Sequence, residues 1–111
     1  SDGHATFALP AHGWLINEFG IVYGGLIAFV AKSAAAAAVQ TVAGPGTTYT
    51  ALDLKVNFLR PVNPDSTDIV ASGTVLHRGR HLVISSSEVT HGGRTVAIAT
   101  GTTALGSEES P

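Results

Sequence analysis

The stretch EFGIVYGGLIAFVAKSAAAAAVQT, residues 18–41, decides the fold class of this chain. Its pattern predicts a helix from Gly25 to about Val42 that is apolar on nearly all sides. A helix of that kind is enclosed by other elements and does not lie on a surface. The alanines at 34–38 carry almost no side-chain bulk, so a sheet can approach the helix axis closely. Lys32 is the one charged residue inside this helix, and a site hypothesis has to account for it.

The rest of the chain has the period of two that is typical of strands. In TTYTALDLKVNFL, residues 47–59, alternate residues from Thr50 to Phe58 are predicted to face a core. Further strands are predicted in HATFALP, IVASGTVLH, HLVISSSEVT and TVAIATGTTAL, which are residues 4–10, 69–77, 81–90 and 95–105. The turns RGR and HGGR join the last three strands as hairpins, which indicates antiparallel pairing. Gly44 is expected to cap the helix in the left-handed conformation, and Pro45 cannot continue it.

Composition limits the function classes. The chain has 111 residues, which predicts one domain over 1–111, with about 7–105 structured and 106–111 as a tail. Only 13% of the residues are charged, so we expect a homodimer or a homotetramer and not a monomer. A net charge of −2 gives no general attraction to nucleic acid or to an anionic membrane. No secretory signal or membrane span is expected, and we predict a cytoplasmic protein.

Metal and serine chemistry are disfavoured. The chain has no cysteine, so thiolate ligands and disulfides are excluded. Its five histidines have no zinc-binding spacing, because His77 and His81 straddle a turn. Ser85, Ser86 and Ser87 lie in a predicted strand without the elbow that serine hydrolases need. We therefore predict no metal and no separate cofactor.

The order strand, long helix and four strands predicts an α+β domain in which an antiparallel sheet of about five strands wraps around one central helix. At this point the sequence resembles the hotdog fold, and within it the acyl-CoA thioesterases of the PaaI-like group. The resemblance covers about Phe7 to Leu105, and its most specific parts are NEFGIVYGG at 17–25 and LDLKVNFLRPV at 52–62. It implies a thioester hydrolase whose substrate carries coenzyme A. A hydratase on the same fold is less favoured, because no His and Asp pair occurs at the helix entry.

The helix entry suits acyl transfer on physical grounds. Gly24 and Gly25 leave their amides unscreened at a helix N-terminus, where the dipole is positive and N–H groups lack helical partners. From spacing alone the glycines are more often simply a tight entry to the helix. The resemblance implies that the Gly25 amide polarises the thioester carbonyl and that Asn17 positions substrate or water. The alternative for Asn17 is a turn former or N-cap.

Two residues depart from the family pattern. Lys32 stands where the family has its catalytic Asp or Glu, and Tyr23 stands where relatives often have His or Gln. Four interpretations of Lys32 stay open. In the first, its stem packs along apolar neighbours and its ammonium reaches solvent or a carboxylate at a subunit boundary, with Glu18 or Asp53 as possible partners. In the second, hydrolysis has been lost, naturally or by deliberate substitution, and only the binding cleft is kept. In the third, Lys32 assists electrostatically while a group such as Glu18 activates water, and in the fourth Lys32 attacks the acyl group itself.

The cluster HRGRH at 77–81 is the candidate carrier site. Arg78, Gly79 and Arg80 form a turn in which two guanidinium groups and exposed amides can bind phosphate oxygens, and His81 can add a hydrogen bond. The alternative is a solvated turn. The resemblance implies that the phosphates belong to coenzyme A, as a part of the substrate. The sequence therefore predicts an acyl-CoA thioesterase-like protein, with a non-catalytic acyl-CoA binding or assembly module as the alternative.

Overall fold

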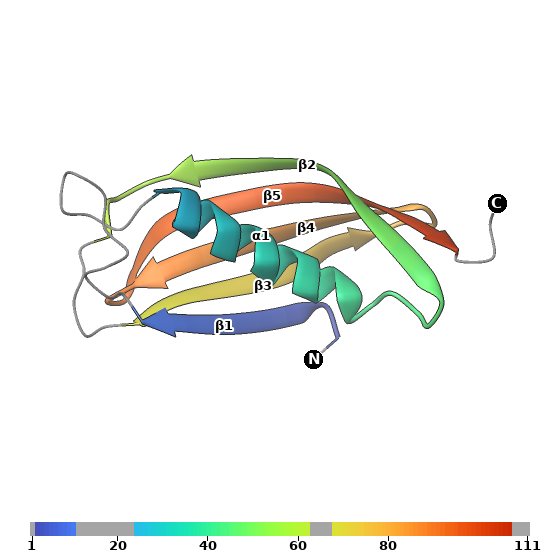
Figure 1. Cartoon of the computed structure of the whole chain (residues 1–111), viewed down its shortest axis with the longest axis horizontal. Coiled ribbons are helices and arrows are strands. Elements are labelled where there is room, and N and C mark those ends of the chain that lie inside the picture. The colour runs from blue at the N-terminus through green and yellow to red at the C-terminus, as the bar shows by residue number, and fades with distance from the viewer. Residues whose placement is uncertain (1, 11–23, 63–67, 108–111) are drawn as a thin grey trace.

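One helix and five strands make up the computed structural model, which describes residues 2–10, 24–62 and 68–107 (Figure 1). The strands are β1 (His4–Pro10), β2 (Thr47–Phe58), β3 (Asp68–Arg78), β4 (Leu82–His91) and β5 (Arg94–Ser107), and the helix is α1 (Gly24–Gln40). Regular structure thus extends beyond the predicted 7–105 range at both ends. No helix in the described part of the chain is long and apolar enough to cross a membrane.

The five strands form a single antiparallel sheet in the order β1-β3-β4-β5-β2. Figure 1 shows the sheet curving around α1, which crosses it diagonally from the end of β2 toward the start of β1. The predicted α+β class and hotdog fold are therefore confirmed. In this order β1 and β2 are the two edge strands, and the sheet has an inner face against α1 and an outer face.

The alanines of α1 allow an unusually close approach of helix and sheet. A methyl group added at Gly73 in β3 would collide with the backbone carbonyl of Ala34. Next to this contact, the Ser87 hydroxyl of β4 donates a hydrogen bond of 2.8 Å to the Ala31 carbonyl. Two strands therefore hold the middle of the helix directly by its backbone.

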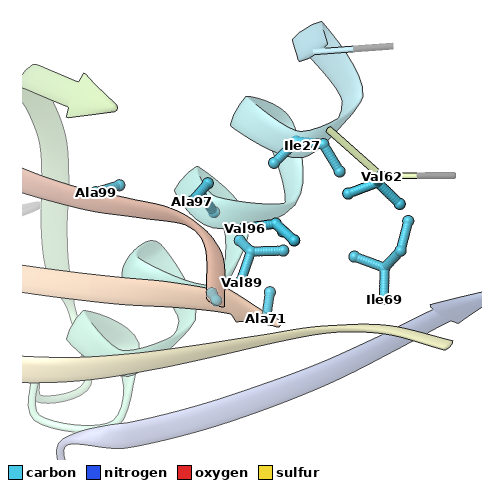
Figure 2. Close-up of a cluster of buried hydrophobic side chains, with 10 residues drawn as sticks. Ile27, Val62, Ile69, Ala71, Val89, Val96, Ala97 and Ala99 are labelled. Atoms are coloured by element: carbon cyan, nitrogen blue, oxygen red, sulfur yellow. The ribbon is translucent and has the colours of Figure 1, made fainter. Parts of the chain in front are cut away.

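A compact cluster of aliphatic side chains fills the space between α1 and the inner face of the sheet (Figure 2). Ile27 contributes from the first turns of the helix, Val62 from the segment after β2, and Ile69 from the start of β3. The cluster is completed by Ala71 of β3, Val89 of β4 and Val96, Ala97 and Ala99 of β5. Ala97 and Ala99 show the alternation expected for a strand with one covered face. The core thus lies mainly under the first half of α1.

The end of the helix differs from the prediction. α1 ends at Gln40, and Gly44 does not have a positive φ, so its predicted role as a left-handed cap is wrong. Pro45 and Gly46 instead occupy the centre of a turn closed by the Thr47 amide, which donates to the Gly44 carbonyl at 3.2 Å. Gly46 has a φ of 73°, which suits the third residue of a type II turn with proline before it.

The edge strand β2 also differs from its predicted pattern. A bulge between Ala51 and Asp53 interrupts the alternation, so Leu52 has no direct partner on β5. Leu52, Leu54 and Phe58 are exposed in the single chain, and only Val56 of the predicted inward set packs against the core cluster. A covered face was therefore wrongly predicted for most of this strand within one protomer.

Candidate functional site

An open groove of about 290 Å³ runs between α1 and the edge strand β2. Figure 1 shows that α1 crosses the sheet diagonally, so that its second half lies farther from β2 than its first turn does. The groove is lined by Lys32, Ala35, Ala36, Ala51, Leu52, Asp53, Leu54, Ser85, Gly101 and Thr103. Its walls are thus mainly small or aliphatic, and its lining includes a single cation. Such a space suits an apolar chain that has one polar or charged group.

Lys32 lies exposed on α1 and lines this groove. The predicted enclosure of the helix on all sides is therefore wrong for one chain, because the side of α1 away from the sheet is uncovered at Gly25, Phe29 and Lys32. Asp53, one of its two predicted partners, accepts a hydrogen bond of 2.9 Å from the Thr102 amide. That carboxylate is therefore engaged at the bulge.

Gly25 is exposed in the first turn of α1, as the oxyanion hypothesis requires. No acidic residue lies in the first turn of the helix, so the positive end of the dipole is not neutralised there by a side chain of that turn. Gly25 and Lys32 share one face of the helix because seven residues make nearly two full turns. They are nevertheless about 10 Å apart along the axis, since an α-helix rises about 1.5 Å per residue.

The Arg78 to His81 turn lies at the opposite end of the sheet from Gly25. The Nε of Arg78 donates to the Val42 carbonyl, just after the end of α1, at 3.3 Å, and its terminal N–H donates to the Gly79 carbonyl at 3.1 Å. The Gly79 amide donates to the Leu82 carbonyl at 2.7 Å and closes the turn. Arg80 and His81 are exposed. One chain therefore does not bring the predicted carrier site and the predicted oxyanion site together.

Two predicted site residues cannot be placed. Asn17 and Tyr23, and with them Glu18, fall outside the residues that the structure describes. Among the described residues, no three His, Asp or Glu side chains lie close enough to hold a metal ion.

Sequence reasoning did not find the strand wall of the groove. Its shape depends on the bulge at Leu52 and on Gly101 of β5, where an added methyl would come within 3.0 Å of the Asp53 carbonyl. A lone glycine inside a strand pattern is the available signal for such a close approach. The sequence ATGTT carries that signal, but nothing near Leu52 marks the bulge.

Comparison with known proteins gives the family. The sequence model of the thioesterase superfamily matches residues 19–99, which is most of the chain. The chain belongs to the thioesterase superfamily. The match includes the entry to α1, the Arg78 to His81 turn and the groove residues up to Ser85, but not Gly101 and Thr103. No curated protein sequence gives a significant match.

Solved structures agree with this assignment. A thioesterase from Haemophilus influenzae superimposes with a TM-score of 0.89 at 19% identity, over 99% of this chain and 76% of the other, which shows a shared fold. A conserved protein from Pseudomonas aeruginosa superimposes with a TM-score of 0.87 at 28% identity, over 95% of this chain and 82% of the other. A variant of the phenylacetic acid degradation protein PaaI from Thermus thermophilus superimposes with a TM-score of 0.84 at 27% identity, over 94% of this chain and 86% of the other. The predicted resemblance to PaaI-like thioesterases is therefore confirmed.

Proposed function

We propose that this superfamily member hydrolyses an acyl-CoA thioester to a free acid and coenzyme A. In this proposal the Gly25 amide and the helix dipole stabilise the oxyanion that forms when water attacks the thioester carbonyl. Asn17 and Tyr23 orient water or substrate beside it, and Lys32 lies in the groove that receives the acyl group. The observation that carries the proposal is the exposed glycine at the start of a helix whose first turn has no acidic residue.

The spacing on α1 supports a site shared between two copies of the chain. A carbonyl oxygen held by the Gly25 amide would lie about two helical turns from Lys32 of the same helix, which is too far for both to act on one thioester. A second copy that runs in the opposite direction can place its own Gly25 near the Lys32 groove of the first. The site in this proposal therefore needs a homodimer.

The edge strand β2 offers the surface for such a pairing. Its outer backbone groups have no partner strand within residues 2–10, 24–62 and 68–107 of one chain, and it exposes Tyr49, Leu52, Leu54 and Phe58. An unpaired and apolar edge of this kind normally pairs or is covered. Antiparallel pairing of β2 with β2 of a second copy about a two-fold axis would extend the sheet and cover these side chains.

The same two-fold axis supports the proposed carrier site. Reversal of the second copy brings its helix start to the end of the sheet where β2 begins in the first copy. The Arg78 to His81 turn lies at that end, so Arg78, Gly79, Arg80 and His81 are suitably placed to hold phosphate groups of a coenzyme A whose thioester reaches the partner's helix. Coenzyme A enters as part of the substrate, and no further cofactor is needed. We place the reaction in the cytoplasm, where acyl-CoA is formed and used.

Lys32 favours a second candidate, a non-catalytic acyl-CoA binding or assembly module. The chain lacks a carboxylate at the position where the family has its acid. A groove with an ammonium group in that place could retain its ligand without turning it over. Turnover and binding must therefore be measured separately.

The test is thiol release from a panel of acyl-CoAs, together with calorimetric binding of coenzyme A. Gly25→Pro deletes the amide while keeping a residue that the first turn of a helix accepts, and Gly25→Ala keeps the amide as a control. We expect Gly25→Pro to lose about a hundredfold in turnover, and Gly25→Ala to lose little. Equal turnover in both variants would remove the oxyanion role. Binding without turnover by the unmodified chain would favour the binding module.

The homodimer has its own test in light scattering at micromolar concentration. We expect a mass at least twice that of the 11.3 kDa chain, and a mass four times as large if two dimers associate. A stable monomer would contradict the shared site.

A further inference from the structure

The chain has two lysines, and only one of them lines the groove between α1 and β2. Lys32 is in that lining, whereas Lys55 of β2 points to the outer face of the sheet, because its neighbour Val56 packs against the core cluster. Both lysines are exposed. The proposed function sends the acyl group into the groove but gives the Lys32 amine no chemistry.

The side chain of Lys32 is not held by an anion within the described part of the chain. Asp53 lies in the same lining, but its carboxylate accepts a hydrogen bond of 2.9 Å from the Thr102 amide. No ion pair or side-chain hydrogen bond joins Lys32 to a residue in the ranges 2–10, 24–62 and 68–107. The amine is therefore free to move on its flexible four-carbon stem and to meet a group that enters the groove.

The lining favours an acyl thioester whose carbonyl lies beside this amine. Ala35, Ala36, Leu52 and Leu54 form an apolar wall, against which the hydrocarbon part of an acyl group can leave water. The thioester carbonyl is the polar end of such a group, and Lys32 is the cation of the lining. Polar groups in a mainly apolar site fix the orientation of the ligand, so the carbonyl is best placed next to Lys32.

An amine and a carboxylate give different products with a thioester. Attack by a carboxylate forms an anhydride, which water cleaves readily. Attack by a neutral lysine amine forms an amide, which water does not cleave under the same conditions. With Lys32 in the place of the family's acid, the expected end of a direct attack changes from release of the acyl group to its retention.

We infer that Lys32 is a site of covalent acylation, which takes the acyl group of a bound acyl-CoA. The neutral Nζ attacks the thioester carbonyl carbon and a C–N bond forms. The C–S bond breaks, the sulfur leaves with the electron pair of that bond, and the proton lost from nitrogen ends on the thiol. The products are an amide at Lys32 and free coenzyme A. The inference rests on the proposed function, because the same groove has to hold the thioester.

Acylation of Lys32 would close the groove to a second substrate. The amide is uncharged, so the lining loses the positive charge of Lys32. The retained acyl group stays against the apolar wall and occupies the groove of about 290 Å³. The reaction therefore stops at one acyl group for each groove, and the modified chain no longer accepts acyl-CoA.

The presence of only two lysines allows a direct test. The unmodified chain is incubated with hexanoyl-CoA, and peptide mass spectrometry measures the hexanoyl groups at Lys32 and at Lys55. The chain has no cysteine, so no protein thiol competes for the acyl group. A succinimidyl ester of acetic acid, which labels amines without needing the groove, compares the two exposed lysines by themselves. Hexyl-CoA, a thioether without a carbonyl, serves as the competitor.

We expect hexanoyl-CoA to acylate Lys32 about a hundredfold faster than Lys55, because binding in the groove replaces a chance encounter of two free reactants. The rate at Lys32 should saturate with hexanoyl-CoA and fall when hexyl-CoA is added. The succinimidyl ester should label both lysines to a similar extent. Equal acylation of the two lysines by hexanoyl-CoA, or a rate at Lys32 that hexyl-CoA does not lower, would overturn the inference.

Lys32→Arg keeps the positive charge and removes the amine that accepts the acyl group, and Lys55→Arg is its matched control. We expect hexanoylation from hexanoyl-CoA to disappear in the first variant and to continue unchanged in the second. An equal loss in both variants would contradict a specific site at Lys32.

The inference and the proposed hydrolysis fail separately when thiol release is followed in the same samples. Continuous release without an acyl group on Lys32 supports hydrolysis and overturns the acylation site. Release of one thiol per groove, matched by one hexanoyl group on Lys32, supports the acylation site and overturns turnover. Release that decays as Lys32 becomes acylated supports both, and the absence of both release and transfer overturns both.

Discussion

The two sides of α1 differ in how completely the chain covers them. The side toward the sheet is held by backbone contacts, with Gly73 against the Ala34 carbonyl and Ser87 bonded to the Ala31 carbonyl. The other side exposes Gly25, Phe29 and Lys32 and borders an open groove. The difference indicates that stability depends on the first side, whereas the second is available for ligand or a second copy. Substitutions on the two sides should therefore change different measurements.

The largest expected effect is on the open side. In the proposed function Lys32 stands where the family's acid is expected, so Lys32→Asp would place a carboxylate there that can act as a general base on water, a role typically worth about a hundred- to ten-thousand-fold in rate. We expect thioesterase activity to rise accordingly, measured by thiol release from acyl-CoA between about pH 6 and 9, because an apolar groove can raise the pKa of the new carboxyl group.

Lys32→Met is the control, because it removes the ammonium without adding a base. If Lys32 itself activates or binds the substrate, activity falls in both variants. If Lys32→Asp folds and binds coenzyme A but hydrolyses nothing, the binding-module function replaces the hydrolase.

On the covered side, Gly73→Ala should cost about 3 kcal/mol of unfolding free energy, because the new methyl group meets a backbone carbonyl that cannot move independently of the helix. Denaturant unfolding measures this loss. Gly44→Ala is the matched control, since its methyl would meet only the Thr47 hydroxyl at 3.8 Å and its φ is not positive. A loss below 0.5 kcal/mol (about the limit for neutral surface changes) at Gly73 would contradict the close packing.

Substitutions in the Arg78 to His81 turn should change the affinity for coenzyme A and not the free energy of unfolding. Replacing Arg78 and Arg80 by Ala should weaken coenzyme A binding by about tenfold and flatten its salt dependence, because charge-assisted hydrogen bonds to phosphate are lost. Unfolding free energy should change by less than about 0.5 kcal/mol, since the two arginines are exposed. Arg94→Ala, in the turn at the other end of the sheet, is the control. Unchanged coenzyme A affinity in the double variant would mean that Arg78 and Arg80 lie in a solvated turn and do not bind phosphate.

The smallest expected effect is a loss of stability on the covered side of α1. Ser87→Ala removes the 2.8 Å hydrogen bond to Ala31 and should cost about 1 kcal/mol, with activity unchanged. Ser86→Ala is its neighbour control, because alternation along β4 turns that side chain to the outer face. A loss of activity in Ser87→Ala with stability intact would show that the two sides of the helix are coupled.

Local signals predicted the elements well. The hairpin at residues 91–94 follows from two adjacent glycines, and Gly92 and Gly93 have φ values of 60° and 77°, as that turn requires. The alanines of α1 predicted the close approach of the sheet. The family motifs gave the fold, and the superfamily match confirms it.

Long-range geometry could not be predicted from the same signals. The bulge at Leu52 has no local marker, and the exposure of β2 depends on its place at the edge of the sheet. By contrast, the separation of about 10 Å between Gly25 and Lys32 already follows from the predicted helix and needs no long-range information. The cap at Gly44 was wrongly predicted because Pro45 and Gly46 form a turn of their own, which sets the chain direction after α1 without a left-handed cap.

The strand order has a consequence for how the chain is made. Among the described strands β2 pairs with β5 alone, so during synthesis from the N-terminus β2 is complete before β5 exists. For that interval Leu52, Leu54 and Phe58 are presented on an unpaired strand, a condition that favours aggregation or chaperone binding. Almost the whole domain must therefore emerge from the ribosome before this strand can be paired, so slow synthesis of the segment between β2 and β5 would prolong its exposure.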